Sequence, residues 1–105
     1  MYVRVTRLSV TTDSQDPGWQ EEVTRQSDRT IAYLRQQPGF RRYLAGGDPA
    51  RKQGIVISEW DTLEQAQRYT PRADLAQAIA KLGIRPDSVD VFEVSSVAEL
   101  AQVVA

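Results

Sequence analysis

The sequence predicts an α+β fold of the ferredoxin-like type, in which a four-stranded antiparallel sheet carries its helices on one face. Two observations support this fold. Stretches with strand and helix periodicity follow one another in the order strand, helix, strand, strand, helix, strand. The chain has 105 residues, a length that suits one compact core. We therefore expect residues 1–105 to form a single domain, with residues 97–105 as a C-terminal tail.

The first strand is predicted over residues 2–10, YVRVTRLSV. Side chains alternate between the two faces of a strand, so Val3 and Val5 are expected to share one face. Arg4 and Thr6 then share the opposite face. The β-branched residues of this stretch favour the same conformation.

A first helix is predicted to begin just after Pro17. Asp16 is a favourable N-cap, and proline is favoured at the first helical position. Apolar residues then recur at steps of three and four, which is typical of a helix with one buried face. The helix is expected to end near Gln36, because Pro38 cannot continue it and Gly39 accepts the positive φ that often ends a helix.

The next two strands are predicted to form a hairpin. Residues 40–46 have the pattern of the second strand and residues 54–60 that of the third. The loop between them contains glycine, aspartate and proline, which are typical turn residues. In the third strand, Ile55, Val56 and Ile57 form an apolar run, which indicates that both faces of the strand are covered.

Helical sequence returns after the third strand. Asp61 is predicted to cap a second helix, with Glu64 in the capping-box position. Pro71 interrupts this helix, and a further short helix is expected to end at Gly83. These segments and the first helix are enough to cover one face of the sheet.

The end of the chain is predicted to supply the last strand. Residues 84–88 are expected to form a turn, and residues 89–97 the strand itself. The tail that follows is expected to form a short helix or an extra edge strand.

Composition excludes several classes of function. The net charge is −1, with 13 basic and 14 acidic residues and no long run of either sign, so we expect no nucleic-acid partner. No apolar stretch is long enough for a membrane helix, and strand-like sequence begins at once, so we expect a cytoplasmic protein with no membrane contact. The chain has neither cysteine nor histidine, and we expect no metal site and no thiolate or histidine catalysis.

One face of the predicted sheet lacks a cover. The helices can lie on only one face, while Val3, Val5, Ile55 and Ile57 are expected on the other. Burying these side chains against a second copy would stabilise association. We therefore predict a homodimer that packs sheet on sheet with twofold symmetry.

Two charged residues share the parity of these apolar positions. Arg7 and Glu59 are predicted to form a partly buried ion pair at or inside the dimer interface. The alternative is that both charged groups reach solvent at the strand ends.

The segment QQPGFRRYLAGGDPARKQGIVISEWDTLEQAQ resembles the antibiotic biosynthesis monooxygenase family of dimeric α/β barrel proteins. Members of that family commonly have a Pro-Gly-Phe sequence after the first helix, a glycine-bearing hairpin, and a strand that ends in tryptophan. The corresponding features are residues 38–40, the glycines at 46, 47 and 54, and Trp60. The resemblance extends from residue 2 to about residue 94.

The resemblance implies a pocket between the sheet and the helices that holds a flat aromatic molecule. It also implies oxidation of a phenol without metal or flavin, through a deprotonated substrate that reacts with oxygen. Haem-degrading relatives use an asparagine on the first strand, the tryptophan at the strand end and a histidine on the second helix. Thr6 occupies the asparagine position and the chain has no histidine, so we do not expect haem degradation by that scheme.

Trp60, Arg4 and Thr6 are the first candidates for substrate contact. Trp60 can line the pocket and donate its N–H, or it can simply belong to the core. Arg4 and Thr6 share the helix-side face, where they can bind an anionic oxygen. The alternative is that Arg4 is solvated at the end of the sheet and that Thr6 is present only because threonine favours strands.

Three further residues complete the candidate set. Tyr33 and Tyr69 can act as hydrogen-bond donors or relay a proton, although core packing with a hydroxyl at the surface is the preferred interpretation. Arg72 can close a pocket mouth, with a solvated charge as the preferred interpretation. No residue is singled out as the catalytic base.

Two functions remain open at this point. The first is a cofactor-independent monooxygenase-like protein acting on an aromatic or polyketide-type phenol or quinol. The second is a noncatalytic homodimeric module of the same fold that binds a small ligand or has a structural role. A pocket of several hundred cubic ångströms would favour the first function. A pocket filled by Trp60 and Tyr33 would favour the second.

Overall fold

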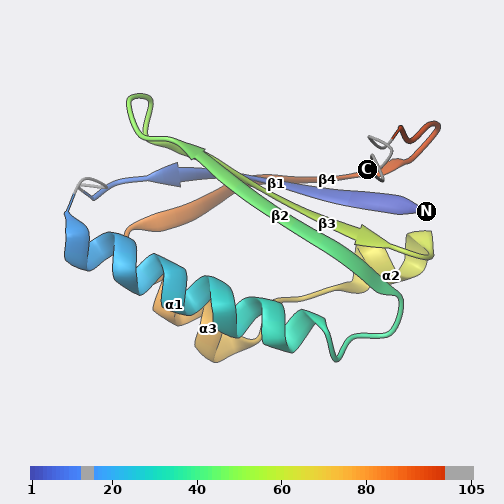
Figure 1. The fold of residues 1–105 in the computed structure, drawn as a ribbon, viewed down its shortest axis with the longest axis horizontal. Helices are drawn as coiled ribbons and strands as arrows, with labels where there is room; N and C mark the ends of the chain where they lie inside the picture. Colours follow the sequence, from blue (N-terminus) through green and yellow to red (C-terminus); the bar gives the residue numbers. More distant parts are fainter. Residues whose placement is uncertain (13–15, 99–105) are drawn as a thin grey trace, which may run out of the picture.

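A computed structural model describes residues 1–12 and 16–98 of the chain. Its strands form one antiparallel sheet in the order β2-β3-β1-β4, so the predicted ferredoxin-like fold class is confirmed. In sequence order the elements are β1 (Tyr2–Val10), α1 (Pro17–Leu34), β2 (Phe40–Asp48), β3 (Gln53–Trp60), α2 (Leu63–Arg68), α3 (Ala73–Lys81) and β4 (Ile84–Glu93) (Figure 1).

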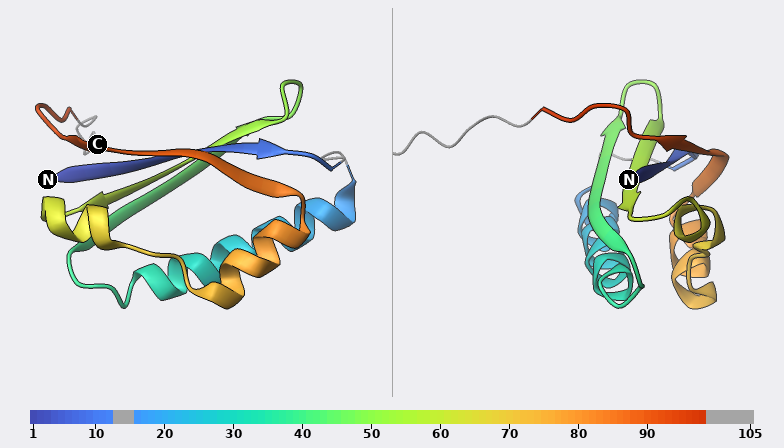
Figure 2. Two further views of the ribbon diagram at one scale, coloured as in Figure 1. Left: turned by 180° about the vertical axis from the view of Figure 1, so that it is seen from behind. Right: turned by 90° about the vertical axis from the view of Figure 1, so that its right-hand side faces the viewer.

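The helices lie on one face of the sheet. Figure 2 shows the sheet as one layer, with α1 and α3 side by side beneath it. The short helix α2 lies under one end of the sheet, beside the ends of β1 and β3 (Figure 1). In the described part of the chain, no helix is long and apolar enough to cross a membrane.

The Pro-Gly-Phe corner between α1 and β2 has the predicted geometry. Gly39 has a φ of 78°, in the left-handed region that favours glycine. Its carbonyl accepts a hydrogen bond of 2.9 Å from the backbone N–H of Asp61, just beyond β3. α1 itself ends earlier, at Leu34, with Arg35 as its C-cap. The corner therefore turns the chain into β2 and attaches the start of β2 to the end of its partner strand.

The predicted cap of the second helix is wrong by one residue. Thr62, not Asp61, is the N-cap of α2, and its hydroxyl accepts a hydrogen bond from the backbone N–H of Gln65. The Gln65 side chain accepts in return from the Thr62 backbone N–H, so Gln65, not Glu64, completes the capping box. Asp61 instead forms an ion pair of 2.7 Å with Arg41.

The last strand begins earlier than predicted. β4 starts at Ile84 and ends at Glu93, so the predicted turn at residues 84–88 is wrong, as is the extension to residue 97. Pro86 is tolerated because β4 is an edge strand. The β1–β4 register also shifts between Arg7 and Leu8, as expected of a bulge. The tail beyond residue 98 lies outside the described residues.

The hydrophobic core lies at the α2 end of the sheet. Trp60, Leu34 and Ala66 form a buried cluster, with the indole of Trp60 only 2% exposed. Phe40 packs against it, and its ring meets the Trp60 ring edge-on at 5.7 Å between centroids. The remaining length of the helical face is not closed in this way.

The apolar side chains that were predicted to share the face opposite the helices do share it. Val5 pairs with Ile57 across the β1–β3 ladder, and Val3 and Ile55 lie on the same face. We call the face that bears these four residues the outer face.

The ion pair predicted between Arg7 and Glu59 does not form within the chain. Arg7 pairs with Ile55, and Glu59 pairs with Val3, so the two charged residues lie four positions apart along β3. This separation corresponds to about 13 Å of strand. The carboxylate of Glu59 lies 3.3 Å from the guanidinium of Arg42 on β2 instead.

Candidate functional site

A cavity of about 670 Å³ lies between the helical face of the sheet and the helices. Its walls come from all four strands, from α1 and α3, and from the segments beside α3. Most of the lining side chains are apolar, and we call this space the inner cavity.

The cavity lies where the side chains between the sheet and the helices are short, beyond the packed α2 end. At the α2 end, large side chains fill the interlayer space, and Trp60 and Leu34 are almost fully buried. Farther along the sheet, the positions that face α1 include Ala45, Gly47 and Gly54. Their short side chains leave the space between the layers open.

Arg4 supplies a positive charge at one end of the inner cavity. Its Nη1 donates a hydrogen bond of 3.0 Å to the carbonyl oxygen of Ala66 in α2. Its guanidinium lies 5.6 Å from the centre of the Tyr69 ring, within the range of a cation–π contact. Burial lowers the pKa of Arg4 from its usual value, yet an arginine stays protonated at neutral pH.

Tyr69 lines the cavity beside Arg4. Burial, reinforced by Tyr33, raises the pKa of the Tyr69 phenol to about 12. The hydroxyl is therefore a neutral hydrogen-bond donor at physiological pH and not a phenolate base. Its ring packs against Trp60, with 5.2 Å between ring centroids, and against Tyr33 at 6.4 Å.

Further hydroxyl groups line the cavity on the same side as Arg4. Tyr43 on β2 hydrogen-bonds to Ser27 on α1, and burial raises the pKa of the Tyr43 phenol. Ser58 on β3 accepts a hydrogen bond of 2.8 Å from the indole N–H of Trp60. In the ladder, Ser58 pairs with both Arg4 and Tyr43.

The other end of the cavity is apolar. Val10 ends β1 there, and Trp19 faces it from the first turns of α1. The indole N–H of Trp19 donates a hydrogen bond of 2.7 Å to the carbonyl oxygen of Leu82, which also accepts one of 2.6 Å from the Thr12 hydroxyl. These two bonds attach the start of α1 and the end of β1 to the end of α3.

The predicted site residues fall into two groups. Arg4, Thr6 and Tyr69 line the inner cavity. Trp60 packs against Tyr69 and belongs to the core. A core position was the alternative interpretation of Trp60 in the sequence. Whether any of these residues contacts a substrate stays a prediction.

Tyr33 and Arg72 lie outside the cavity lining, and Tyr33 packs against Tyr69. Arg72 lies 5.9 Å from the centre of the Tyr33 ring and forms an ion pair of 2.5 Å with Asp74. The bonded guanidinium of Arg72 holds the pKa of the Asp74 carboxyl well below its usual range.

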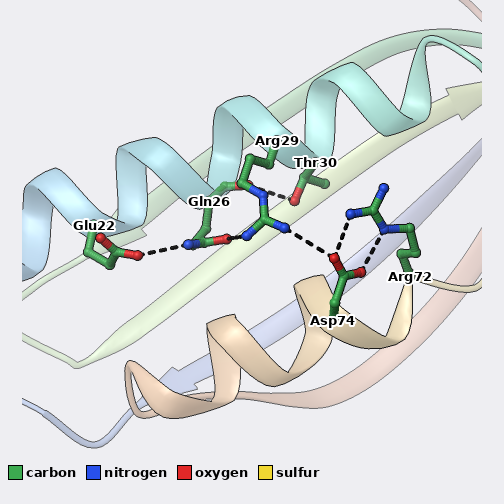
Figure 3. Close-up of polar contacts among 6 residues, drawn as sticks. All are labelled: Glu22, Gln26, Arg29, Thr30, Arg72 and Asp74. Atoms are coloured by element: carbon green, nitrogen blue, oxygen red, sulfur yellow. Dashed lines mark hydrogen bonds and ion pairs between the residues drawn. The ribbon is translucent and has the colours of Figure 1, made fainter.

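Asp74 also belongs to a polar network that joins α1 to α3 (Figure 3). It accepts a bond of 3.1 Å from Arg29 of α1, and Arg29 donates to the side-chain oxygen of Gln26 at 2.9 Å. The Gln26 side-chain nitrogen donates in turn to Glu22 at 2.8 Å. Gln26 is 5% exposed and lines the cavity, so the network connects the cavity wall to the surface.

Sequence reasoning missed Gln26, Ser27, Tyr43 and Ser58 as cavity residues. A glutamine or serine on a helix has no local signal that separates a cavity wall from a solvated face. For Tyr43 and Ser58 a signal existed, because strand parity places them on the same face as Arg4 once the register is known. Among the described residues, no group of three or more acidic, histidine or cysteine side chains is placed to hold a metal ion.

No protein-family model matches the sequence, and no curated protein matches it. Solved structures do match the fold. SnoaB, a cofactor-independent oxygenase from Streptomyces nogalater, is 19% identical with a TM-score of 0.68, and the match covers 91% of this chain and 94% of SnoaB.

Two other solved structures show the same likeness. A monooxygenase from the gene ActVA-Orf6 of Streptomyces coelicolor, in complex with nanaomycin D, is 17% identical with a TM-score of 0.66, over 95% of this chain and 92% of that one. A candidate antibiotic biosynthesis monooxygenase from Deinococcus radiodurans is 15% identical with a TM-score of 0.66, over 97% and 100%. The predicted resemblance to antibiotic biosynthesis monooxygenases is therefore confirmed for the fold.

Proposed function

We propose that this protein is a cofactor-independent monooxygenase-like enzyme that oxidises an aromatic or polyketide-type phenol or quinol in the inner cavity. The observation that carries the proposal is the cavity itself, whose volume of about 670 Å³ falls in the range of small-molecule sites. Trp60 and Tyr33 do not fill it. Two proteins of similar fold support the reaction class, since one is a cofactor-independent oxygenase and the other a monooxygenase with a bound ligand.

The substrate supplies the electrons in the proposed reaction. Loss of a proton makes an electron-rich anion, and a ring carbon of this anion forms a C–O bond with molecular oxygen. The O–O bond then breaks, so that one oxygen atom stays in the product as a carbonyl and the other leaves as water. In an anthrone, which is the keto form of such a phenol, the ring methylene loses the two hydrogens that leave in the water, so no external reductant is needed.

The protein's part in this reaction is to orient the substrate and stabilise its negative charge. We assign direct substrate contact to Arg4, Thr6 and Tyr69, which line the cavity. Trp60 and Tyr33 would act by packing against Tyr69, and Arg72 by its contact with Tyr33.

Oxygen consumption tests this proposal. We expect the wild-type protein to consume oxygen with at least one member of a panel of anthrones and quinols. The variant Thr6→Phe places a ring in the cavity and is expected to lower the rate by about tenfold or more. Its urea midpoint is measured alongside, so that lost activity is not confused with lost folding. Absence of oxygen uptake by the wild type across the panel would refute the enzyme proposal.

A noncatalytic ligand-binding module is the second candidate, and one observation favours it. The described cavity lining contains no carboxylate and no histidine, so no side chain there is an obvious base at neutral pH. Saturable binding of the same anthrones and quinols without oxygen uptake would favour this second function.

We also propose that the protein is a homodimer through its outer face. Beside the four predicted residues, Leu44 and Phe92 lie on this face and are 47% and 55% exposed. Burying the exposed half of either side chain would contribute about 1 kcal/mol. Together these residues bring apolar side chains from all four strands to the outer face.

Light scattering at micromolar concentration tests the dimer. We expect twice the mass of one chain for the wild type and a shift toward the single-chain mass for Phe92→Asp. Val97→Asp is the control, because Val97 is also exposed but lies beyond the end of β4. A wild-type mass equal to one chain would contradict the proposal.

A further inference from the structure

We propose that the ligand of the inner cavity is an elongated amphipathic anion that lies along β1, with its ionised oxygen at Arg4 and its apolar end beside Trp19. This inference rests on the proposed function only in treating the cavity as a ligand site. It adds the charge, the length and the direction of the molecule that binds there.

The length of the ligand follows from the strand that floors the cavity. The lining residues of β1 run from Arg4 to Val10, with Thr6 and Leu8 between them. The six residue-to-residue steps from Arg4 to Val10 extend over about 20 Å. Opposite them, lining residues occur from the first turns of α1, at Trp19, to its last residue, Leu34. The cavity is therefore a long slot rather than a round pocket.

The charge of the ligand follows from an unbalanced cation. Among the residues that line the described cavity, Arg4 is the only one with a full charge at neutral pH. The guanidinium makes one hydrogen bond, to a carbonyl oxygen, and a ring contact with Tyr69. Within residues 1–12 and 16–98, no carboxylate is paired with it. A partly buried charge without a counter-ion is costly, and an anionic ligand would remove this cost.

The surroundings of Arg4 suit an oxyanion. The Ala66 carbonyl and the Tyr69 ring hold the guanidinium on the cavity wall, which leaves its other N–H groups free to bind oxygen. Tyr69, whose ring contacts the guanidinium, adds a neutral phenol to the same part of the cavity lining. The guanidinium would repel a cationic ligand.

The direction of the ligand follows from the opposite end of the slot. The indole N–H of Trp19 and the hydroxyl of Thr12 are both already bonded to the carbonyl oxygen of Leu82. The neighbouring lining residues Val10, Val23 and Ile84 have no polar side-chain atoms. An ionised group placed there would lose its hydration without compensation, so the apolar part of the ligand belongs at this end.

A matched pair of ligands tests the charge. The probes are anthracene-2-carboxylate and its neutral methyl ester, with binding measured by calorimetry under nitrogen. We expect the wild type to bind the carboxylate about tenfold more tightly than the ester. Arg4→Gln should abolish this preference, and Arg4→Lys should retain most of it. Arg7→Gln is the matched control, because Arg7 is an exposed residue of the same strand on the outer face. Its preference should equal that of the wild type.

A second pair of ligands tests the direction. Val23→Trp shortens the slot at its apolar end and is expected to weaken binding of anthracene-2-carboxylate by about tenfold. Binding of benzoate, which is short enough to stay at Arg4, should be unchanged. Thermal unfolding of each variant confirms that the fold is retained.

Several results would overturn the inference. The charge would be wrong if the wild type bound carboxylate and ester equally, or if Arg4→Gln still preferred the carboxylate. The direction would be wrong if Val23→Trp lost benzoate binding. The ligand class would be wrong if neither anthracene probe bound. These outcomes are independent of oxygen chemistry. A protein that passes the binding tests but consumes no oxygen would refute the enzyme proposal and leave this inference intact.

Discussion

Replacing Trp60 with phenylalanine should lower stability strongly while leaving ligand affinity almost unchanged. Trp60 is one of the first candidates for substrate contact in the sequence, yet the residue is 2% exposed and packs in the core against Tyr69. A core residue acts on the free energy of unfolding, and a ligand contact acts on the binding constant. Measuring both quantities on one variant separates the two roles.

The expected loss can be worked from the contacts of the indole. Its N–H donates a buried hydrogen bond of 2.8 Å to the hydroxyl of Ser58. Losing such a bond costs about 1 kcal/mol. The smaller phenyl ring also gives up apolar burial and leaves a small void, worth about 1–2 kcal/mol. The free energy of unfolding should therefore fall by about 2–3 kcal/mol, which corresponds to a lower melting temperature by about 10 °C or more.

Urea unfolding followed by circular dichroism, at one fixed protein concentration, measures this loss. A double-mutant cycle with Ser58→Ala isolates the hydrogen bond, and a coupling energy of about 1 kcal/mol is expected. Trp60→Phe leaves Trp19 as the remaining tryptophan, and Trp19 lines the cavity, so its fluorescence reports binding in the same variant. Unchanged stability together with a tenfold loss of affinity would refute the reasoning and make Trp60 a ligand contact.

Two further predictions concern the corner and the cavity tyrosine. Gly39→Ala should lower the free energy of unfolding in urea by about 1–3 kcal/mol, because φ is 78° and the new Cβ would lie 1.8 Å from Oε1 of Gln65. Gly46→Ala is the control, because no atom lies within 4 Å of a Cβ added there. Equal losses of stability in the two variants would contradict the argument. The Tyr69 pKa is raised to about 12, so its neutral form is favoured by folding and stability should fall as pH rises from about 10 to about 12. This fall should be smaller in Tyr69→Phe, and an identical pH profile for the two proteins would exclude Tyr69 as its source.

Much of the fold was predictable because the signals are local. Alternation along β1 placed Arg4 and Thr6 opposite Val5, and the ladder to β3 confirms this arrangement. Pro38 and Gly39 form the turn between α1 and β2 for steric reasons that act within a few residues. Such features do not depend on the rest of the chain.

Other features depended on partners that local patterns do not reveal. In the sequence, Pro86 indicated a turn. In the structure it lies within a strand, because β4 is at the edge of the sheet and has a bulge near this residue. Glu59 was expected to pair with Arg7, but the register brings Arg42 of β2 next to it. Register is a property of two strands and is not contained in either one.

The candidate site divides in the same way. The faces of the strands, and therefore the presence of Arg4 and Thr6 on the helical side, are determined by the sequence alone, because the alternation of side chains is intrinsic to an extended backbone. The inner cavity is decided by the tertiary structure. Its volume depends on how far side chains fill the space between α1, α3 and the sheet. These side chains come from segments far apart in the sequence, and they are large at Trp60 and Leu34 and small at Ala45 and Gly54.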